Sequence, residues 1–130
     1  MRYLCLDYGL KRIGVAISDE DGRMAFPAGV IINRGGSAVY KDIAEKVKKE
    51  KISCIVVGLP IGLNGKETDQ TKITRSFIAL LEKIIHLPVE TQNEMLTSRM
   101  AVRAGMKDHH IDAASSAIIL QSYLDKMNKK

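Results

Sequence analysis

The first 32 residues contain short apolar runs that are separated by turn residues. Runs of this kind are typical of strands joined by short turns. They predict an antiparallel meander of one strand that ends at Asp7, a second over residues 12–19 and a third over residues 24–32. Pro27 lies in the third run, and proline has no N–H to donate to a neighbouring strand. This strand is therefore expected at an edge of the sheet or with a bulge.

From residue 37 onwards, apolar positions with the period of a helix alternate with continuous apolar runs of the buried-strand type. The predicted helices cover residues 37–51, 71–86, 97–104 and 111–127, and the predicted strands cover 52–60 and 87–92. The apolar stripe of the second helix is expected to consist of Ile73, Phe77, Leu80, Leu81 and Ile84.

A strand that returns through a helix normally lies parallel to its neighbour in the same sheet. The sequence therefore predicts an α/β fold with a mixed five-stranded sheet. Its first three strands form the meander, its last two run parallel to the first, and helices cover both faces. No repeat or linker interrupts the pattern, so residues 1–130 are expected to form one domain.

Composition and charge narrow the range of functions. The chain has 130 residues, of which 45% are hydrophobic and 27% charged, as in an ordinary globular domain. Its net charge of +5 favours a polyanionic partner such as nucleic acid, although a solubilising surface has a similar balance. The apolar stretches are too short to cross a bilayer, and the first residues predict no signal peptide. We therefore expect a cytoplasmic protein with no membrane partner, in which Cys5 and Cys54 are buried free thiols.

Three carboxylates are predicted to meet at one edge of the sheet. Asp7 ends the first strand and Glu94 follows the fifth, and ligands of open α/β sheets bind at the carboxyl ends of the strands. Asp112 is expected in the first turn of the last helix, which reaches the same place if it packs across the sheet. Three acids so placed repel one another unless a cation compensates them. Oxygen ligands favour Mg²⁺ or Mn²⁺, and two such ions can promote phosphodiester hydrolysis.

Each carboxylate also has a purely structural interpretation. Asp112 could cap the last helix, Glu94 could be a surface acid, and Asp7 could begin an Asx turn. For Asp7 the functional interpretation is favoured, because aspartate is poor strand material and here interrupts an apolar strand. Lys11 and Arg12, at the predicted hairpin tip, either hold a phosphate or form a solvated turn.

Four segments of the chain resemble the motifs of one family. The segment LDYGLKRIGVAISD (6–19) resembles the first motif of the YqgF family, also called RuvX, whose members are RNase H-like proteins related to Holliday-junction resolvases. The segments IVVGLPIGLNGKET (55–68), NEMLTSRMA (93–101) and IDAASSAIILQSYLD (111–125) are similar to its second, third and fourth motifs. The four blocks follow the family's order and span nearly the whole chain.

The resemblance implies an RNase H-like fold and a divalent-metal nuclease. Asp7, Glu94 and Asp112 would be its catalytic residues and metal ligands. The role most often assigned to the family is maturation of the 5′ end of 16S ribosomal RNA from its precursor. Residues expected to contact the nucleic-acid backbone lie in the hairpin tip, in the loop after the fourth strand and after the fifth strand. They are Gly9, Lys11, Arg12, Gly58, Pro60, Asn64 and Arg99.

The third motif departs from the family's usual Asp-Glu-Arg, because here it reads Asn93, Glu94 and Met95. The central carboxylate is retained, but a neighbouring acid and an arginine expected to contact phosphate are absent. Arg99, one helical turn further on, could partly replace that arginine. This departure is expected to affect binding of the substrate more than binding of the metal.

Other functions remain open on the sequence alone. A Holliday-junction resolvase acting on branched DNA needs two active sites, whereas the RNA nuclease could be a monomer or a weak homodimer. The changes at Asn93 and Met95 could instead mark a non-catalytic RNA-binding factor. The hairpin DYGLKRIG also resembles the phosphate-binding turn of actin-like ATPases and sugar kinases, which clamp ATP between two such subdomains.

Overall fold

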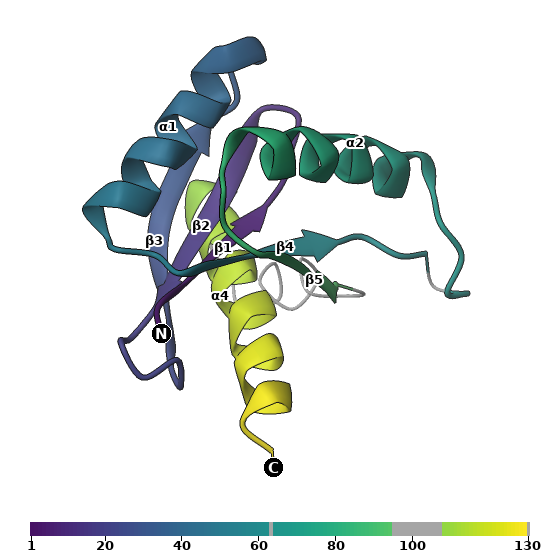
Figure 1. Ribbon diagram of the computed structural model, residues 1–130. Coiled ribbons are helices and arrows are strands. Elements are labelled where there is room, and N and C mark those ends of the chain that lie inside the picture. The colour runs from purple at the N-terminus through teal and green to yellow at the C-terminus, as the bar shows by residue number, and fades with distance from the viewer. Residues whose placement is uncertain (63, 95–107, 130) are drawn as a thin grey trace.

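The computed structural model of the protein describes residues 1–62, 64–94 and 108–129. The strands form one five-stranded sheet in the order β3-β2-β1-β4-β5. The antiparallel part consists of β1 (Tyr3–Asp7), β2 (Arg12–Ser18) and β3 (Ala25–Ile32). The parallel part is formed by β1 with β4 (Cys54–Leu59) and β5 (Val89–Asn93) (Figure 1). The predicted mixed sheet is confirmed, and the carboxyl ends of β1, β4 and β5 share one edge.

β3 is an edge strand, as the proline in its sequence indicated. Pro27 pairs with Ala16 of β2, and the register of this pair of strands shifts between Gly14 and Ala16. Proline has no N–H to donate, and it is tolerated here because the strand lies at the edge of the sheet and its register is irregular.

The helices cover both faces of the sheet. α1 (Gly36–Lys49) and α2 (Asp69–Ile84) pack on one face, and α4 (Asp108–Met127) crosses the other (Figure 1). Successive side chains of a strand point to opposite faces, so Leu4 and Leu6 of β1 belong to the first core and Cys5 to the second. All six residues of β4 are buried, as expected of a parallel strand covered on both sides.

The buried face of α2 differs from the predicted stripe. Ile73, Leu80 and Ile84 are 38%, 48% and 47% exposed. The buried positions of this helix are Thr71, Thr74, Phe77, Ile78 and Leu81. Phe77 stacks on Tyr8, with the ring centroids 4.3 Å apart, and this contact fixes which side of the helix turns toward the sheet. The prediction is confirmed for Phe77 and Leu81 and wrong for the other three positions, because the buried face is rotated toward Ile78 and the two threonines.

α4 begins at Asp108, three residues before the predicted start at residue 111. Asp112 therefore lies in the second turn of the helix rather than the first, and it is not the helix cap. The predicted helix over residues 97–104 lies outside the described residues. Among the residues described, no helix has the length and apolar character needed to span a membrane.

Candidate active site

The β1–β2 hairpin places a carboxylate and two cations next to one another. Asp7 is the last residue of β1, and the tip that follows is tied to the segment after β3. Asn33 donates one hydrogen bond from its side chain to the Gly9 carbonyl at 2.8 Å and one from its backbone to the Lys11 carbonyl at 2.9 Å. A Cβ atom on Gly9 would overlap the carbonyl oxygen of Arg12, so closure of the hairpin itself requires glycine here. The tip thus holds Lys11 and Arg12 beside Asp7.

Glu94 follows β5 and turns back over the end of β4. Its backbone N–H donates to the Leu59 carbonyl at 3.1 Å, which fixes its place at the edge of the sheet. Gly58 leaves room for its carboxylate, since a Cβ there would lie 2.9 Å from Glu94 Oε2 and 2.7 Å from Ile119. This glycine therefore makes space for an acid. Glu94 Oε2 itself is buried and has no hydrogen-bond partner among the described residues.

Asp112 reaches the same edge from α4. The helix crosses β2 so closely that a Cβ on Gly14 would overlap the backbone of Asp112. On the exposed side of this crossing, Arg12 Nε donates to Asp112 Oδ2 at 2.6 Å. The third carboxylate is therefore held by a cation that belongs to the hairpin.

These residues line a pocket of about 560 Å³ at the carboxyl ends of β1, β4 and β5. Its lining residues are Asp7, Tyr8, Gly9, Leu10, Lys11, Arg12, Pro60, Gln70, Glu94 and Asp112. The fold thus brings all three predicted carboxylates to one cavity, together with four of the predicted substrate-contacting residues.

The two inner carboxylates disturb each other's ionisation. Burial raises the pKa of Asp7 to about 6, a hydrogen bond with Glu94 lowers it, and the charge of Asp112 raises it. Burial raises the pKa of Glu94 to about 9, and the charge of Asp7 and the hydrogen bond with Asp7 both add to this shift. Without a cation, two negative charges at close range repel each other, so the pair retains one proton at neutral pH and Glu94 holds it more strongly than Asp7.

The donor set of Asp7 and Glu94 fits a hard divalent cation. Both offer carboxylate oxygens, and one of these, Glu94 Oε2, is buried and unpartnered. Across residues 1–62, 64–94 and 108–129, however, no group of three or more His, Cys, Asp or Glu side chains is arranged to bind one metal ion together. One oxygen of the third carboxylate, Asp112 Oδ2, is instead bound to the Arg12 guanidinium.

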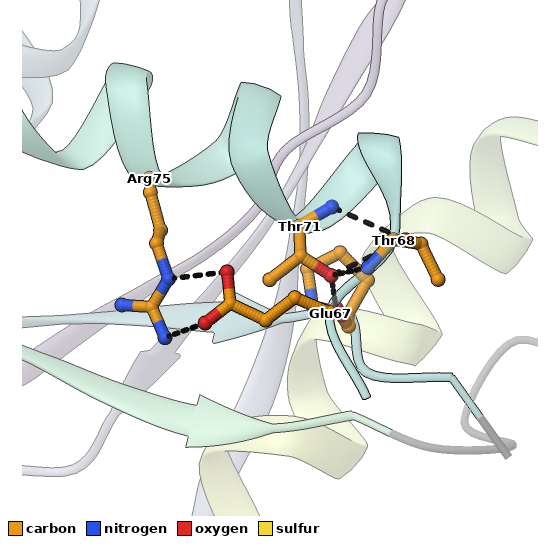
Figure 2. A network of polar contacts seen from close by, with 5 residues as sticks. Glu67, Thr68, Thr71 and Arg75 are labelled. Carbon is orange, nitrogen blue, oxygen red and sulfur yellow. Dashed lines mark hydrogen bonds and ion pairs between the residues drawn. The ribbon is translucent and has the colours of Figure 1, made fainter. Parts of the chain in front are cut away.

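Hydrogen bonds join the segment between β4 and α2, which carries Pro60 of the pocket wall, to the first turn of α2. Figure 2 shows Thr68 capping α2, with its hydroxyl accepting from the Thr71 backbone at 3.3 Å and its N–H donating to Thr71 Oγ1 at 2.9 Å. The Thr71 hydroxyl also donates to the Pro60 carbonyl. Arg75 forms two hydrogen bonds to the carboxylate of Glu67, at 3.0 and 2.9 Å (Figure 2).

Two described residues that were predicted to contact the substrate, Gly58 and Asn64, are not among those that line the pocket. Asn64 accepts a hydrogen bond from the Lys66 backbone at 3.1 Å and so closes its own loop. Arg99, like Met95, lies outside the described residues. Conversely, Gln70 lines the pocket and was missed, because the helix was expected to begin at residue 71. The capping threonines at 68 and 71 were the signal that could have located this earlier start.

The fold and the pocket define a nuclease of the RNase H-like class. The chain belongs to the RuvX family, whose model, described as Holliday junction resolvase, matches residues 1–126. The predicted family and nuclease class are thereby confirmed.

Individual relatives agree with this assignment. A protein of Sulfurihydrogenibium sp. named as a pre-16S rRNA nuclease is 39% identical over 137 residues, which cover 98% of this chain and 92% of the relative. One from Maridesulfovibrio salexigens with the same name is 36% identical over 132 residues, 95% of this chain and 98% of the relative. Among solved structures, Thermus thermophilus RuvC in complex with a Holliday junction substrate matches with a TM-score of 0.59. The match covers 98% of this chain and 97% of that one at 13% sequence identity, so it supports the fold alone.

Proposed function

We propose that this chain is an endonuclease that depends on Mg²⁺ or Mn²⁺ and cleaves the precursor of 16S ribosomal RNA. The observation that carries the proposal is the half-buried pair of Asp7 and Glu94 in the pocket, with the buried Glu94 Oε2 left without a partner among the described residues. A structural acid pair would be expected to satisfy such an atom, because an unpaired buried polar group costs free energy.

The side chains around the pocket have different roles in this proposal. Asp7, Glu94 and Asp112 hold the metal, which when bound activates water and stabilises the leaving oxygen. Lys11 and Arg12 contact the phosphates beside the bond that is cut, as cations commonly do in nucleic-acid complexes. Pro60 and Gln70 form the opposite wall and limit how the backbone lies across the carboxylates.

The choice of ribosomal RNA follows the names of the relatives, and the description of the family favours branched DNA as the second candidate. The two substrates make different demands on assembly. Paired incision of a four-way junction needs two pockets acting together, whereas an RNA end can be trimmed by a monomer or a weak homodimer. A substrate of this kind would be met in the cytoplasm, where we expect the protein.

The test is cleavage of an end-labelled precursor 16S fragment and of a four-way DNA junction, with and without Mn²⁺. The variants Asp7→Asn and Glu94→Gln keep the shape of the pocket but remove a charge, and cleavage should fall at least about 10²-fold. Glu67→Gln is the matched control, because this carboxylate pairs with Arg75 outside the pocket.

Each outcome decides between the candidates. RNA cleavage that needs the metal and both pocket acids supports the proposal. If the protein cuts the four-way junction symmetrically and leaves the RNA intact, and if analytical ultracentrifugation shows a dimer, the activity is that of a resolvase instead. Salt-sensitive RNA binding without cleavage by any protein at any metal concentration would favour a binding factor.

A further inference from the structure

The two cations at the hairpin tip differ in what they contact. Lys11 is exposed in the pocket and forms no ion pair within the described part of the chain. Arg12 is half-buried, with 35% of its side chain exposed, and its Nε lies 2.6 Å from Asp112 Oδ2, whose side chain is 27% exposed. The residues are neighbours in sequence, yet only Arg12 is joined to a predicted metal ligand.

The backbone on both sides of the Arg12–Asp112 pair has little freedom to move. α4 lies against β2 at Gly14, where even a Cβ atom would not fit beside Asp112. Arg12 is the first residue of β2 and is paired in the sheet with Ile32. A change in the ion pair must therefore come from the side chains.

The guanidinium and a metal ion compete for Asp112. An oxygen that accepts a short hydrogen bond from Arg12 has less electron density to offer a cation, and the positive charge repels that cation. Guanidinium groups bind phosphate as readily as carboxylate. A substrate phosphate in the pocket thus offers Arg12 an alternative partner of the same kind.

We propose that Arg12 withholds Asp112 from the metal until a substrate phosphate takes over its guanidinium, so that the third ligand becomes available only on the substrate-bound enzyme. This inference rests on the proposed function, because it takes Asp7 and Glu94 as the other metal ligands. It makes Arg12 a positioning residue that acts through Asp112.

The exchange couples two binding events. If a phosphate must release Asp112 before the metal site is complete, nucleic acid strengthens metal binding, and metal strengthens nucleic-acid binding by the same factor. The metal site of such an enzyme is complete only when nucleic acid is bound, so the enzyme without substrate does not carry an active hydrolytic centre.

The experiment measures Mn²⁺ affinity from the electron paramagnetic resonance signal of free Mn²⁺. The proteins are the full chain, Arg12→Gln and Lys11→Gln, each with and without a short phosphorothioate RNA hairpin that resists cleavage. Without RNA, Arg12→Gln should bind Mn²⁺ at least about fivefold more tightly than the unmodified chain, the lower end of typical coupling between sites. Lys11→Gln removes the same charge from the same pocket and should change the affinity less than about twofold, as expected for an exposed charge.

Two further comparisons separate the exchange from a general effect of charge. The RNA hairpin should strengthen Mn²⁺ binding to the unmodified chain but not to Arg12→Gln. In an Asp112→Asn background, Arg12→Gln should change Mn²⁺ affinity no more than Lys11→Gln does, because only the general effect of removing a charge remains when the group that Arg12 controls is gone. Equal effects of Arg12→Gln and Lys11→Gln would overturn the proposal, as would RNA coupling that survives in Arg12→Gln.

Asp7→Asn distinguishes failure of this inference from failure of the proposed function. If Asp7→Asn weakens Mn²⁺ binding but Arg12→Gln leaves it unaltered, the metal site stands and the role of Arg12 is wrong. If Asp7→Asn has no effect on Mn²⁺ binding, the metal site fails and the inference fails with it. Circular dichroism of each variant confirms that the chain is folded in these measurements.

Discussion

Two strand ends border the pocket, and they use their polar groups in opposite ways. After β1, the segment from Asp7 to Arg12 directs its charges into the cavity. After β4, the polar groups of Pro60 and Thr68 are bonded instead to the first turn of α2, where the Thr68 N–H donates to Thr71 Oγ1 and the Thr71 hydroxyl donates to the Pro60 carbonyl. Both segments were expected to contact nucleic acid. A polar group that is already satisfied within its own loop supports the site, whereas one left unpaired is available to a ligand.

Gly58→Ala should have the largest effect on this comparison, because it places a methyl group at the end of β4 against the carboxylate of Glu94. The new methyl group would lie 2.9 Å from Glu94 Oε2 and 2.7 Å from Ile119, so both must shift. The free energy of unfolding should fall by about 1–3 kcal/mol, as is usual for overpacking. Mn²⁺ affinity should fall as well, since Glu94 is displaced. Urea denaturation and Mn²⁺ titration measure the two effects, and an unchanged affinity would show that Glu94 is not held in place by this contact.

The metal-free protein should lose stability as the pH rises, because of Asp7. The folded-state pKa of this group is raised, so between the ordinary aspartate value near 4 and that raised pKa the unfolded chain binds fewer protons than the folded one. Stability falls across this window and stays lower above it. At pH 8, Asp7→Asn should therefore be more stable than the unmodified chain, by about 1–3 kcal/mol.

Thermal unfolding at pH 4 and pH 8 in the presence of a chelator checks this prediction. Asp19→Asn is the control of opposite sign, because the backbone N–H of Arg23 lowers the pKa of Asp19 and its removal should destabilise the protein at pH 8. Added Mn²⁺ should raise the melting temperature of the unmodified chain more than that of Asp7→Asn. A gain for Asp7→Asn that is equally large at pH 4 would rule out ionisation as its cause.

Thr68→Ala tests whether the loop after β4 contributes to stability without contributing to metal binding. It removes the hydroxyl that caps α2, and loss of such a cap costs about 1 kcal/mol of unfolding free energy. Mn²⁺ affinity should stay within about twofold, since this residue does not line the pocket. Thr68→Ser, which retains the hydroxyl, should recover most of the stability. A large loss of metal affinity would mean that the loop also shapes the carboxylate pair.

Glu67→Gln should change the free energy of unfolding least among these variants. The ion pair of Glu67 with Arg75 is solvent-exposed, with 44% and 52% of the two side chains accessible. Such pairs contribute less than about 1 kcal/mol and weaken with salt. Denaturation in low and high salt should show a small difference that disappears in high salt. A loss of cleavage activity in this variant would contradict the assignment of the loop as a support.

The elements of the fold and the candidate acids were predictable because their signals are local. The period of apolar residues identified the strands and three described helices, and Pro27 marked the edge strand. Asp7 stood out because it interrupts an apolar run, and the motif resemblance named Glu94 and Asp112 beside it. Hydrophobic periodicity and turn chemistry act over a few residues, so they can be read along the chain.

The order of the elements, the edge at which the parallel strands end and the acids expected there could all be predicted from the chain. The buried face of α2, the position of Gln70 in the pocket and the pairing of Arg12 with Asp112 across 100 positions of sequence could not. These contacts depend on how closely α4 crosses β2 and on how α2 is rotated. Close packing between distant elements sets both, and the pattern of a single segment does not contain it.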